Sequence, residues 1–562
     1  MASSLREQRR KHVVLDSPTS SSQATHLMSQ SSFSLDHGVP EFGHRRSFSA
    51  ASVGFHMDDG DGSGSKGFSE LPRKDKRNFL LLVLLYFLQG VPMGLASGSV
   101  PFLLKSHVGY SEMGVFSLAS YPYSLKLLWS PIVDAIWSRK LGRRKSWILP
   151  IQTISGLGML WLGARAEAMM DAAGMDGGAG IWGFTSWWFM LVFMCATQDI
   201  AVDGWALTLL STENLSYAST AQTVGLTAGS FLSSTVFLAF SSKDFANKWF
   251  RTIPGDTGLI TLGGALTVSG WLYLLVTVGL AAMKREEYTK NSDGVWDVYK
   301  IMGGILKLKN IQTLLIVHLI AKIGFQANDA VTSLKLLDKG LKQEELALTV
   351  LIDFPFEIFL GYYVGKWSQT IPPMKLWCWG FVGRLIAAGI AQTVVMFFPS
   401  AGVNTPYFLG VIFQHVLSTF MNTVMFVAVS AFHARIADPV IGGTYMTLLA
   451  TVTNLGGTFP RFFILKFVDM FTVASCIPPT TPLPPDALKG DPITAAFSCV
   501  AEPEKQRCAA GGGTCNISTD GYYIVNVLCI IIGVVTFWGF IKPAVLKLQA
   551  LPMKAWRLSD GS

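Results

Sequence analysis

The sequence predicts an all-α protein that spans a membrane. Three observations lead to this fold class. Hydrophobic residues make up 50% of the 562 residues and charged residues only 15%, whereas soluble domains carry roughly 25% charged residues. The mean hydropathy of the chain is +0.39. The apolar residues also gather in segments of roughly 20 residues or more, which is the length that a helix needs to cross a bilayer.

Twelve segments have this length and character, so we expect twelve transmembrane helices. The even number returns both termini to one side of the membrane, which we expect to be the cytosol. The predicted spans are residues 78–100, 112–136, 147–166, 182–209, 217–241, 258–283, 311–333, 346–367, 377–398, 404–433, 441–470 and 521–543.

The charges of the connections support this orientation. The second connection, 137–146, and the sixth, 284–310, are rich in Lys and Arg, whereas the third, 167–181, carries mainly acids. Basic residues prefer the cytosolic side of a membrane. The net charge of +8 therefore indicates a lipid bilayer as partner, and we expect no nucleic acid.

The connection 284–310 divides the predicted spans into two six-helix halves. The N-terminal bundle is expected at 78–283 and the C-terminal bundle at 311–543. Within the cytosolic linker, Val295–Leu308 has apolar residues at helical spacing and is predicted to lie on the membrane surface. The Ser-rich and Gly-rich residues 1–77 predict a disordered cytosolic tail. Residues 544–562 form the predicted C-terminal tail.

The fourth span carries polar residues where a membrane helix is normally apolar. Asp199 and Asp203 are four residues apart, so a helix places both on one face, with Gln198 beside them. A carboxylate at membrane depth costs free energy unless water, a cation or a proton compensates it. These residues therefore predict a solute-lining cavity or a buried ion network. The alternative is that the helix ends early and leaves both acids at the cytosolic edge.

Three cations also fall inside predicted spans. They are Lys126 in the second span, Lys322 in the seventh and Arg384 in the ninth. Asp329 lies seven residues after Lys322 and so shares its helix face. Cations at this depth favour an anionic solute, because phosphate or carboxylate would compensate them. The alternative for each cation is an internal salt bridge with an aspartate of these spans.

Other polar residues complete the predicted solute path. Tyr445 and Asn454 lie in the eleventh span. His415, in the tenth span, has no evident partner and is expected to be a structural polar residue rather than part of this path. No cluster has the spacing of a metal site or of a Ser/His/Asp set, and no P-loop is present. The sequence therefore predicts no metal, no cofactor and no catalytic residues. We expect acidic and basic groups of both halves to converge on one wet cavity.

After the second span the chain reads PIVDAIWSRKLGRRK, residues 131–145. This run resembles the signature of the major facilitator superfamily, in which an Asp at a helix end precedes a basic turn. Asp134, Gly142, Arg143 and Arg144 match the signature, although Pro131 stands where Gly is usual. The resemblance implies two six-helix halves and a cytosolic latch formed by the Asp and the Arg.

The connection 472–520 holds four of the seven cysteines, Cys476, Cys499, Cys508 and Cys515. On the predicted topology it faces the non-cytosolic side. Clustered cysteines in an oxidising compartment predict two disulfides, with three pairings open. Cys508 and Cys515 are close enough in sequence to close a tight loop. A zinc site is the alternative, although CxxC pairs are missing. Asn516 begins an N-glycosylation sequon.

Several long stretches resemble one family, the acetyl-coenzyme A transporters of the endoplasmic reticulum. They are LLLVLLYFLQGVPMGLASGSVPFLL, SLKLLWSPIVDA, GRRKSW, ATQDIAVDGWALTLLS, AKIGFQANDAVTSLKL and DPVIGGTYMTLLATVTNLGG. The resemblance runs from about Phe79 to Lys547. It implies a multi-pass protein of the endoplasmic reticulum membrane that moves acetyl-CoA or CoA into the lumen for acetylation. Bacterial muropeptide permeases are more distant members of the superfamily.

Two other functions remain open from the sequence. The same fold can carry another organic anion, such as a glutathione-like peptide or a muropeptide. A membrane acyltransferase would need a catalytic His at membrane depth, for which His415 is the candidate. Arg461 follows GGTFP and is left out of the predicted solute site. The sequence leaves a homodimer open.

Overall fold

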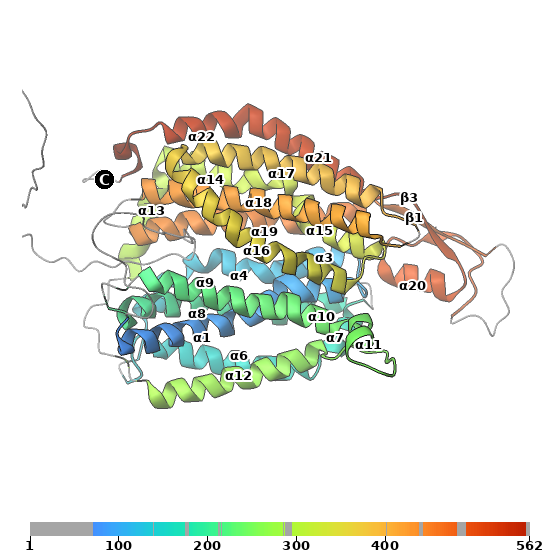
Figure 1. Cartoon of the computed structure of the whole chain (residues 1–562), viewed down its shortest axis with the longest axis horizontal. Coiled ribbons are helices and arrows are strands. Elements are labelled where there is room, and N and C mark those ends of the chain that lie inside the picture. Colours follow the sequence, from blue (N-terminus) through green and yellow to red (C-terminus); the bar gives the residue numbers. More distant parts are fainter. Residues whose placement is uncertain are drawn as a thin grey trace, which may run out of the picture. The chain divides into compact units, whose positions relative to one another are not determined.

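The computed structural model describes residues 71–138, 140–174, 179–211, 214, 216–284, 286, 295–400, 402–437, 442–479 and 490–557. Most of the predicted N-terminal tail lies outside these residues. The described chain is built almost entirely from helices (Figure 1). Its first helix begins at Arg73, before the predicted start of the first span.

The helices up to residue 283 are α1 Arg73–Gly94, η2 Leu95–Ser99, α2 Val100–Leu104, α3 Tyr110–Ser117, η3 Leu118–Ser120, α4 Tyr121–Leu125, η4 Lys126–Leu128, α5 Ser130–Ala135, α6 Lys145–Gly163, α7 Ala166–Ala173, α8 Ala179–Leu209, α9 Ser216–Phe231, η7 Leu232–Val236, α10 Phe237–Ser241, α11 Lys243–Trp249 and α12 Leu262–Met283. We call these helices the first bundle.

The chain continues with the linker helix α13 Val295–Lys307. The second bundle then comprises α14 Lys309–Ala321, η8 Lys322–Phe325, α15 Gln326–Asp338, α16 Gln343–Thr370, α17 Pro373–Met396, α18 Thr405–Ile436, α19 Gly442–Phe471, α21 Gly521–Thr536, η10 Phe537–Ile541 and α22 Lys542–Gln549. Between α19 and α21 lie β1 Val473–Ile477, β2 Phe497–Ser498, α20 Glu502–Ala510 and β3 Thr514–Thr519. The short turn η11, Met553–Trp556, ends the described chain.

Nine helices in the described part are long and apolar enough to cross a membrane, or ten if the bent pair α6 and α7 forms one span. Each of the twelve predicted spans nevertheless coincides with a helix or a series of helices. The second predicted span is broken into short helices between Tyr110 and Ala135. The eighth corresponds to α16, which has 28 residues. The all-α membrane fold is confirmed, and the count of twelve stays a prediction.

Glycines allow α1 and α9 to pack closely in the first bundle. A Cβ on Gly90 would lie 2.5 Å from the backbone oxygen of Leu226, and one on Gly229 would lie 2.3 Å from that of Phe87. Small residues at such spacing let helix backbones approach one another in a membrane. The sequence spacing of these glycines is thus explained by helix packing.

A similar close approach joins two irregular helices of the second bundle. A Cβ on Gly324 in η8 would lie 2.7 Å from the Cα of Gly533 in α21. Further along, the rings of Phe381 and Phe537 stack with centroids 4.7 Å apart. The glycine contact lies at the break between α14 and α15, which begins at Lys322.

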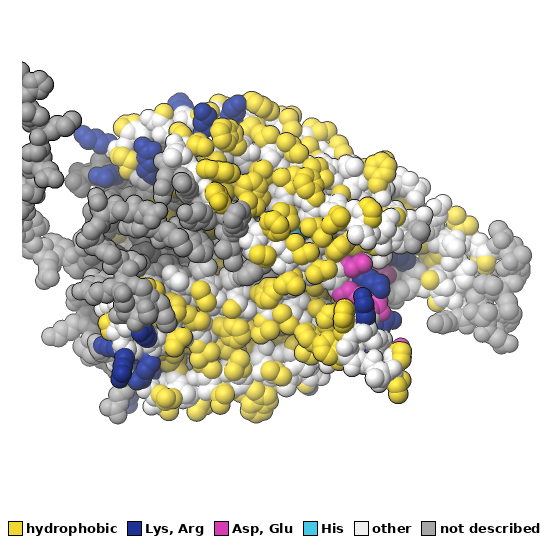
Figure 2. Space-filling view, in the orientation of Figure 1, with side chains coloured by type: hydrophobic (Ala, Val, Ile, Leu, Met, Phe, Trp, Pro, Cys, Tyr) yellow, Lys and Arg dark blue, Asp and Glu magenta, His cyan; other side chains and the backbone are white. Residues whose placement is uncertain are grey.

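Apolar side chains cover the outer faces of both bundles. Figure 2 shows hydrophobic side chains along the helices, whereas Lys and Arg gather at the end of the molecule that carries α22. Val268 and Leu275 on α12 are about 70% exposed, at 70% and 71%. Exposed apolar side chains of this size are favourable where lipid replaces water. The surface therefore fits a membrane-embedded protein.

The cysteine-bearing connection folds into a small cap. Its sheet has the order β2-β1-β3, with both neighbours antiparallel to β1. Disulfides join Cys476 to Cys508 and Cys499 to Cys515. The tight loop between Cys508 and Cys515 that the spacing suggested is therefore wrong, because the folded cap places Cys476 of β1 beside Cys508 of α20. We call the described residues 473–479 and 490–519 the disulfide cap.

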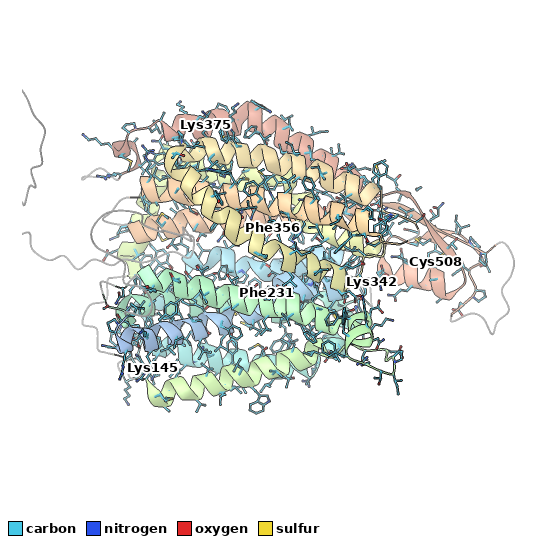
Figure 3. All side chains as sticks on the ribbon, viewed as in Figure 1. Lys145, Phe231, Lys342, Phe356, Lys375 and Cys508 are labelled. Atoms are coloured by element: carbon cyan, nitrogen blue, oxygen red, sulfur yellow. A yellow bond between two sulfur atoms is a disulfide. The ribbon has the colours of Figure 1, made fainter. Side chains whose placement is uncertain are left out.

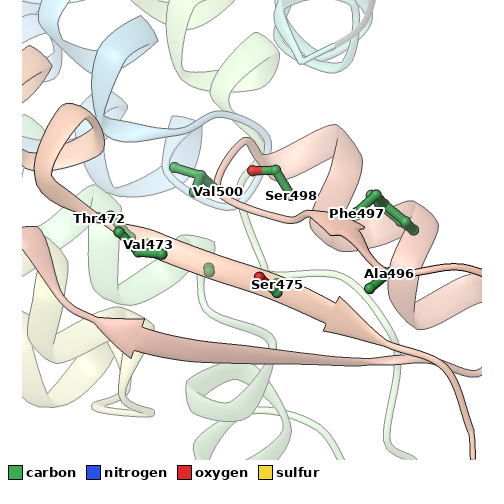
Figure 4. A pocket seen from close by; sticks show the side chains of 8 residues that line it. Thr472, Val473, Ser475, Ala496, Phe497, Ser498 and Val500 are labelled. Carbon is green, nitrogen blue, oxygen red and sulfur yellow. The ribbon is translucent and has the colours of Figure 1, made fainter.

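The cap and the basic connections lie at opposite ends of the helices. Figure 3 places Lys145 and Lys375 at one end, whereas Lys342 and Cys508 lie at the other. We call the latter the cap end. Asn516 is exposed on β3. An open pocket of about 380 Å³ lies beside β1 and β2 (Figure 4), lined by Thr472, Val473, Ala474, Ser475, Ala496, Phe497, Ser498 and Val500. None of these is a predicted site residue.

The linker and the C-terminus both add helices at the basic end. The predicted surface helix is present as α13, in which Met302 and Ile305 are buried and Trp296 is exposed. The last membrane helix continues through η10 into α22, past the predicted end at residue 543. Trp556 then packs into the second bundle against Phe432.

Candidate solute site

Asp199 on α8 is the centre of a buried polar network in the first bundle. Gln89 Nε2 donates a hydrogen bond to its carboxylate at 2.6 Å, and Tyr123 Oη donates one at 3.4 Å. Lys126 donates to the same carboxylate and forms an ion pair with it. Asp199 has an exposed fraction of 0%, so these partners replace the water that the charge has lost.

The break in the second predicted span positions Lys126. The helix α4 ends at Leu125, and the 3-10 segment η4 begins at Lys126 and turns the chain before α5. The ammonium group also lies 4.8 Å from the ring centroid of Tyr123. Lys126 is therefore held by Asp199 and by an aromatic ring, rather than extending to the membrane surface.

Asp203 lies one helical turn after Asp199 and belongs to the same network. Tyr86 Oη donates to Asp203 at 2.6 Å and Gln222 Nε2 donates at 3.0 Å. The predicted shared face of the two acids is thus present. Gln198 has another role, because its Nε2 donates to the backbone oxygen of Leu85 at 3.2 Å and ties α8 to α1.

A second network surrounds Arg384 in the second bundle. Its guanidinium group forms an ion pair with Asp329 on α15. Its Nη1 donates to Ser418 Oγ at 2.7 Å and to the Ser418 backbone oxygen at 3.0 Å. The guanidinium carbon lies 4.5 Å from the ring centroid of Phe325. Arg384 thus joins α15, α17 and α18 at one point.

Asn328 extends this second network. Its Nδ2 donates to Ser418 Oγ at 3.1 Å, and its Oδ1 accepts from Gln414 Nε2 at 3.1 Å. Sequence reasoning missed five polar residues of these networks. They are Gln89, Tyr86 and Gln222 in the first network and Ser418 and Gln414 in the second. Each is a polar side chain within an apolar span, so a search that weighed amides and hydroxyls as well as charges would have found them.

Lys322 lies against α19. A Cβ on Gly457 would be 3.0 Å from Lys322 Nζ, so the ammonium group occupies the space that the glycine leaves open. Arg461 follows one turn later on the same face of α19. The sequence prediction left Arg461 out of the solute site.

The remaining predicted residues lie elsewhere. Tyr445 Oη donates to the backbone oxygen of Trp556 at 3.0 Å and is fully buried. Asn454 is exposed on α19. His415 Nε2 lies 3.4 Å from a carboxylate oxygen of Asp353, so the expectation that this histidine has no partner is wrong. The partner comes from the adjacent helix α16, which sequence spacing does not reveal.

The predicted latch residues meet at the basic end of the first bundle. Arg144 Nη1 donates to Asp134 Oδ1 at 2.7 Å, and Arg143 Nε donates to the Asp134 backbone oxygen at 3.0 Å. Gly142 has φ +97°, a backbone conformation that favours glycine. The Glu286 carboxylate accepts the backbone N–H of Arg144 at 2.9 Å. Glu286 is a further residue that sequence reasoning missed.

The two networks lie on either side of a contact between the bundles. Ser124 Oγ in α4 lies 2.8 Å from Thr458 Oγ1 in α19, and Tyr121 Oη donates to the Phe459 backbone oxygen at 3.1 Å. Lys126 follows α4 directly, and Lys322 packs on α19. Lys126 and Arg384 each pair with an aspartate of their own bundle, as the salt-bridge alternative predicts. A wet cavity shared by both bundles stays a prediction.

Charged groups also join the bundles at the cap end. Lys105 Nζ lies 3.0 Å from Asp338 Oδ1, and Tyr110 Oη donates to the other Asp338 oxygen at 2.7 Å. Lys342 Nζ lies 3.4 Å from Asp244 Oδ2. We call these five residues the clasp. It connects α2, α3 and α11 to the helices α15 and α16, so the bundles are held together at this end.

Solved structures of membrane transporters share this arrangement of helical bundles. A bacterial homologue of the human lysosomal transporter Spinster, in an inward-facing and unoccupied conformation, aligns with a TM-score of 0.57, 15% identity and coverage of 86% of this chain and 100% of that one. The nucleoside transporter NupG aligns with a TM-score of 0.55, 12% identity and coverage of 84% and 100%. The fold is that of the major facilitator superfamily.

The chain belongs to the family described as acetyl-coenzyme A transporter 1, whose model matches residues 78–293, 282–376 and 372–558. An uncharacterized membrane protein of Saccharomyces cerevisiae (strain ATCC 204508 / S288c) is 44% identical over 570 residues, which cover 88% of this chain and 99% of the relative. The anhydromuropeptide permease of Escherichia coli (strain K12) is 27% identical over 194 residues, 34% of this chain and 35% of that protein.

Proposed function

We propose that the protein moves acetyl-CoA from the cytosol into the lumen of the endoplasmic reticulum by alternating access, and so supplies lumenal acetylation. The observation that carries an anionic solute is the presence of two cations inside the second bundle, with Arg384 paired to Asp329 and Lys322 packed against Gly457 of α19. Membership of a family described as acetyl-coenzyme A transporter 1 supports acetyl-CoA as this anion, because its phosphates would compensate the cations.

The clasp supports a conformation that is closed at the cap end. The two disulfides suit an oxidising compartment, so we assign the cap end to the lumen. The basic end with the Asp134–Arg144 pair, and both termini, then face the cytosol. Acetyl-CoA would enter from the cytosol, the clasp would open as the bundles rock about the α4–α19 contact, and the solute would leave into the lumen.

Uptake into vesicles tests this function. Purified protein is reconstituted into liposomes and offered acetyl-CoA that carries one label on the acetyl group and another on the adenine. Saturable entry of both labels in equal amounts is the expected result. Entry of the acetyl label alone would instead indicate an acyltransferase, for which His415 and Asp353 are the pair to substitute. Failure of both labels to enter would reject the proposal.

Transport of another organic anion is the second candidate. The similarity to the anhydromuropeptide permease favours it, and a glutathione-like peptide belongs to the same class of solute. The same vesicles should therefore be offered a labelled anhydromuropeptide and labelled glutathione disulfide. Saturable entry of either peptide without entry of acetyl-CoA would replace the first candidate with the second.

A further inference from the structure

The charged side chains of the first network do not balance. Lys126 forms an ion pair with Asp199, which leaves Asp203, one helical turn later on α8, without a cation of its own. Among the residues that the structure describes, Asp203 accepts hydrogen bonds only from Tyr86 Oη at 2.6 Å and Gln222 Nε2 at 3.0 Å, which are both neutral. A carboxylate at membrane depth costs free energy unless something compensates its charge.

Arg144 does not supply the missing charge. Its guanidinium group lies against Gly204, the residue after Asp203, since a Cβ there would be 2.1 Å from the guanidinium carbon. The group is nevertheless paired with Asp134, to which Nη1 donates at 2.7 Å. Within the described ranges of the chain it forms no ion pair with Asp203.

The groups around Asp203 that carry or exchange charge come from its own helix and from the elements packed against it. They are Asp199 on α8, Tyr86 on α1, Tyr123 on α4, Lys126 on η4, Asp134 on α5, and Arg143 and Arg144 before α6. Each cation of this set has an aspartate other than Asp203 as its ion-pair partner. The excess negative charge of the set is therefore located at Asp203.

Two acceptor oxygens of the first network have no donor. Tyr86 and Gln222 both donate to the same oxygen of Asp203, Oδ1, so Oδ2 accepts nothing from the described part of the chain. Gln89 is completely buried, with an exposed fraction of 0%. Its Nε2 donates to Asp199 at 2.6 Å, whereas its Oε1 has no partner among the described residues. Because buried acceptors normally have donors, the network has room for one more hydrogen.

A proton on Oδ2 of Asp203 would remove the uncompensated charge. The hydrogen bonds from Tyr86 and Gln222 would stay in place, because Oδ1 of a protonated carboxyl group remains an acceptor. Asp203 is only partly buried, so its proton can exchange with water. A metal ion fits less well. Hard cations take about six or more oxygen ligands, whereas Tyr86, Gln89 and Gln222 direct hydrogens at these carboxylates.

We propose that Asp203 binds a proton that moves together with the solute, so that the protein is a proton-coupled symporter. The Oδ2–H bond forms with a proton from water while the basic end is open. It breaks after the bundles have rocked, and the proton leaves with the solute at the cap end. This inference rests on the proposed function for alternating access and for the cargo, whereas proton binding by Asp203 is measured without any solute.

The first test detects the proton by infrared difference spectroscopy of the purified full-length protein in lipid nanodiscs. A protonated carboxyl group has a C=O stretching band that a carboxylate lacks. As the buffer changes from mildly alkaline to mildly acidic, we expect a component of this band to appear in wild type and to be missing in Asp203→Asn. Asp297→Asn removes an exposed carboxylate of α13 and is the matched control, which keeps the component. Bands of equal size in all three proteins would overturn the proposal.

A second variant serves if Asp203→Asn does not fold. Tyr86→Phe keeps the Asp203 carboxylate and removes one of its two donors. Because a hydrogen bond to the charged form changes the proton affinity of a carboxylate, the pH at which the component appears must change. An unchanged pH in Tyr86→Phe would also count against Asp203 as the proton site.

The second test measures coupling in vesicles that take up labelled acetyl-CoA, with the membrane potential held at zero by potassium and valinomycin. Accumulation is compared with and without an about tenfold higher proton concentration outside. One proton per solute molecule raises the accumulation by up to about tenfold. We expect this rise in wild type and in Asp297→Asn, and a ratio of about one in Asp203→Asn. The ratio is compared because a substitution in the candidate site also affects the rate.

The outcomes separate the proton site from the cargo. Uptake by wild type that does not respond to the proton gradient would overturn the coupling, as would the same ratio in Asp203→Asn and wild type. An infrared component that depends on Asp203, without any uptake of acetyl-CoA, would keep the proton site and reject only the proposed cargo.

Discussion

At the scale of single residues, the buried pair Lys126–Asp199 shows how a charge is tolerated at membrane depth. Removing one member leaves the other charge without compensation, and such a loss costs about 3–5 kcal/mol in buried pairs. Removing both members replaces the pair with neutral groups of similar size. The double change therefore avoids the uncompensated charge that each single change creates, which makes the coupling within the pair measurable.

We predict that Lys126→Met and Asp199→Asn each lower the free energy of unfolding by about 3–5 kcal/mol, whereas the double variant loses less than the sum of the two. Denaturant unfolding in nanodiscs measures the four proteins of the cycle. Losses that simply add would show that the ion pair observed in the structure contributes no coupling.

Gly204 gives a second prediction at this scale. A Cβ at this position would lie 2.1 Å from the guanidinium carbon of Arg144, so Gly204→Ala must displace Arg144 from Asp134. We expect vesicle uptake to fall to about the level of Asp134→Asn, with little loss of stability because Asp134 is partly exposed. Normal uptake by Gly204→Ala would separate the Asp134–Arg144 pair from transport. Gly183→Ala provides the control on the same helix, because a Cβ there would meet no described atom within 4 Å.

At the scale of elements, the packing of α1 on α9 depends on glycines, which have no side chain to keep the two helices apart. A Cβ on Gly94 would lie 2.2 Å from Ser233 Oγ and 2.7 Å from the Ser230 backbone. A larger residue must push the helices apart, because backbone cannot move aside as a flexible side chain can.

Gly94→Leu is therefore expected to lower the free energy of unfolding by at least about 1–3 kcal/mol and to reduce the yield of folded protein. Gly279→Leu on α12 is the matched control, since a Cβ there meets no atom of the described residues within 4 Å. Thermal unfolding of the two variants measures the difference. Equal melting temperatures would contradict the role of Gly94 in close packing.

At the scale of the whole molecule, the clasp sets which end of the bundles is closed. Asp338→Asn removes the ion pair with Lys105 but keeps an acceptor for Tyr110. A partly exposed ion pair contributes about 1 kcal/mol, which changes a ratio of two states about fivefold. We expect the population that is open at the cap end to rise by about this factor.

Spin labels at Ser106 and Lys339, one on each side of the clasp, report this change as a longer distance by pulsed electron resonance. Asp297→Asn is the control, because Asp297 forms an exposed ion pair with Lys300 on the linker helix α13. A distance distribution that is the same in Asp338→Asn and in wild type would show that this carboxylate does not hold the cap end closed.

The membrane fold could be predicted from the sequence, because an apolar segment of about 20 residues with few charges is typical of a membrane-spanning helix. The sequence also placed Asp199 and Asp203 on one face, since helical spacing alone decides that. It could not assign Gln89 and Gln222 to these acids, because their helices meet Asp199 only in three dimensions. The sequence prediction also left Arg461 out of the solute site. Lys322 packs against Gly457, one helical turn before Arg461, and this contact exists only in the folded structure. The disulfide pairing could not be predicted either, because the register of β1 and β3 places Cys476 opposite Cys515, yet Cys476 bonds to Cys508 and Cys515 bonds to Cys499.

The sheet of the disulfide cap has a mechanical consequence. β1 follows α19 with one residue between them, β3 leads into α21 with one residue between them, and the two strands pair from Val473 to Ile477. The cap-end tips of both helices are consequently fastened at a constant spacing. In the proposed opening of the cap end, α19 and α21 would therefore move together, because the paired strands β1 and β3 join them.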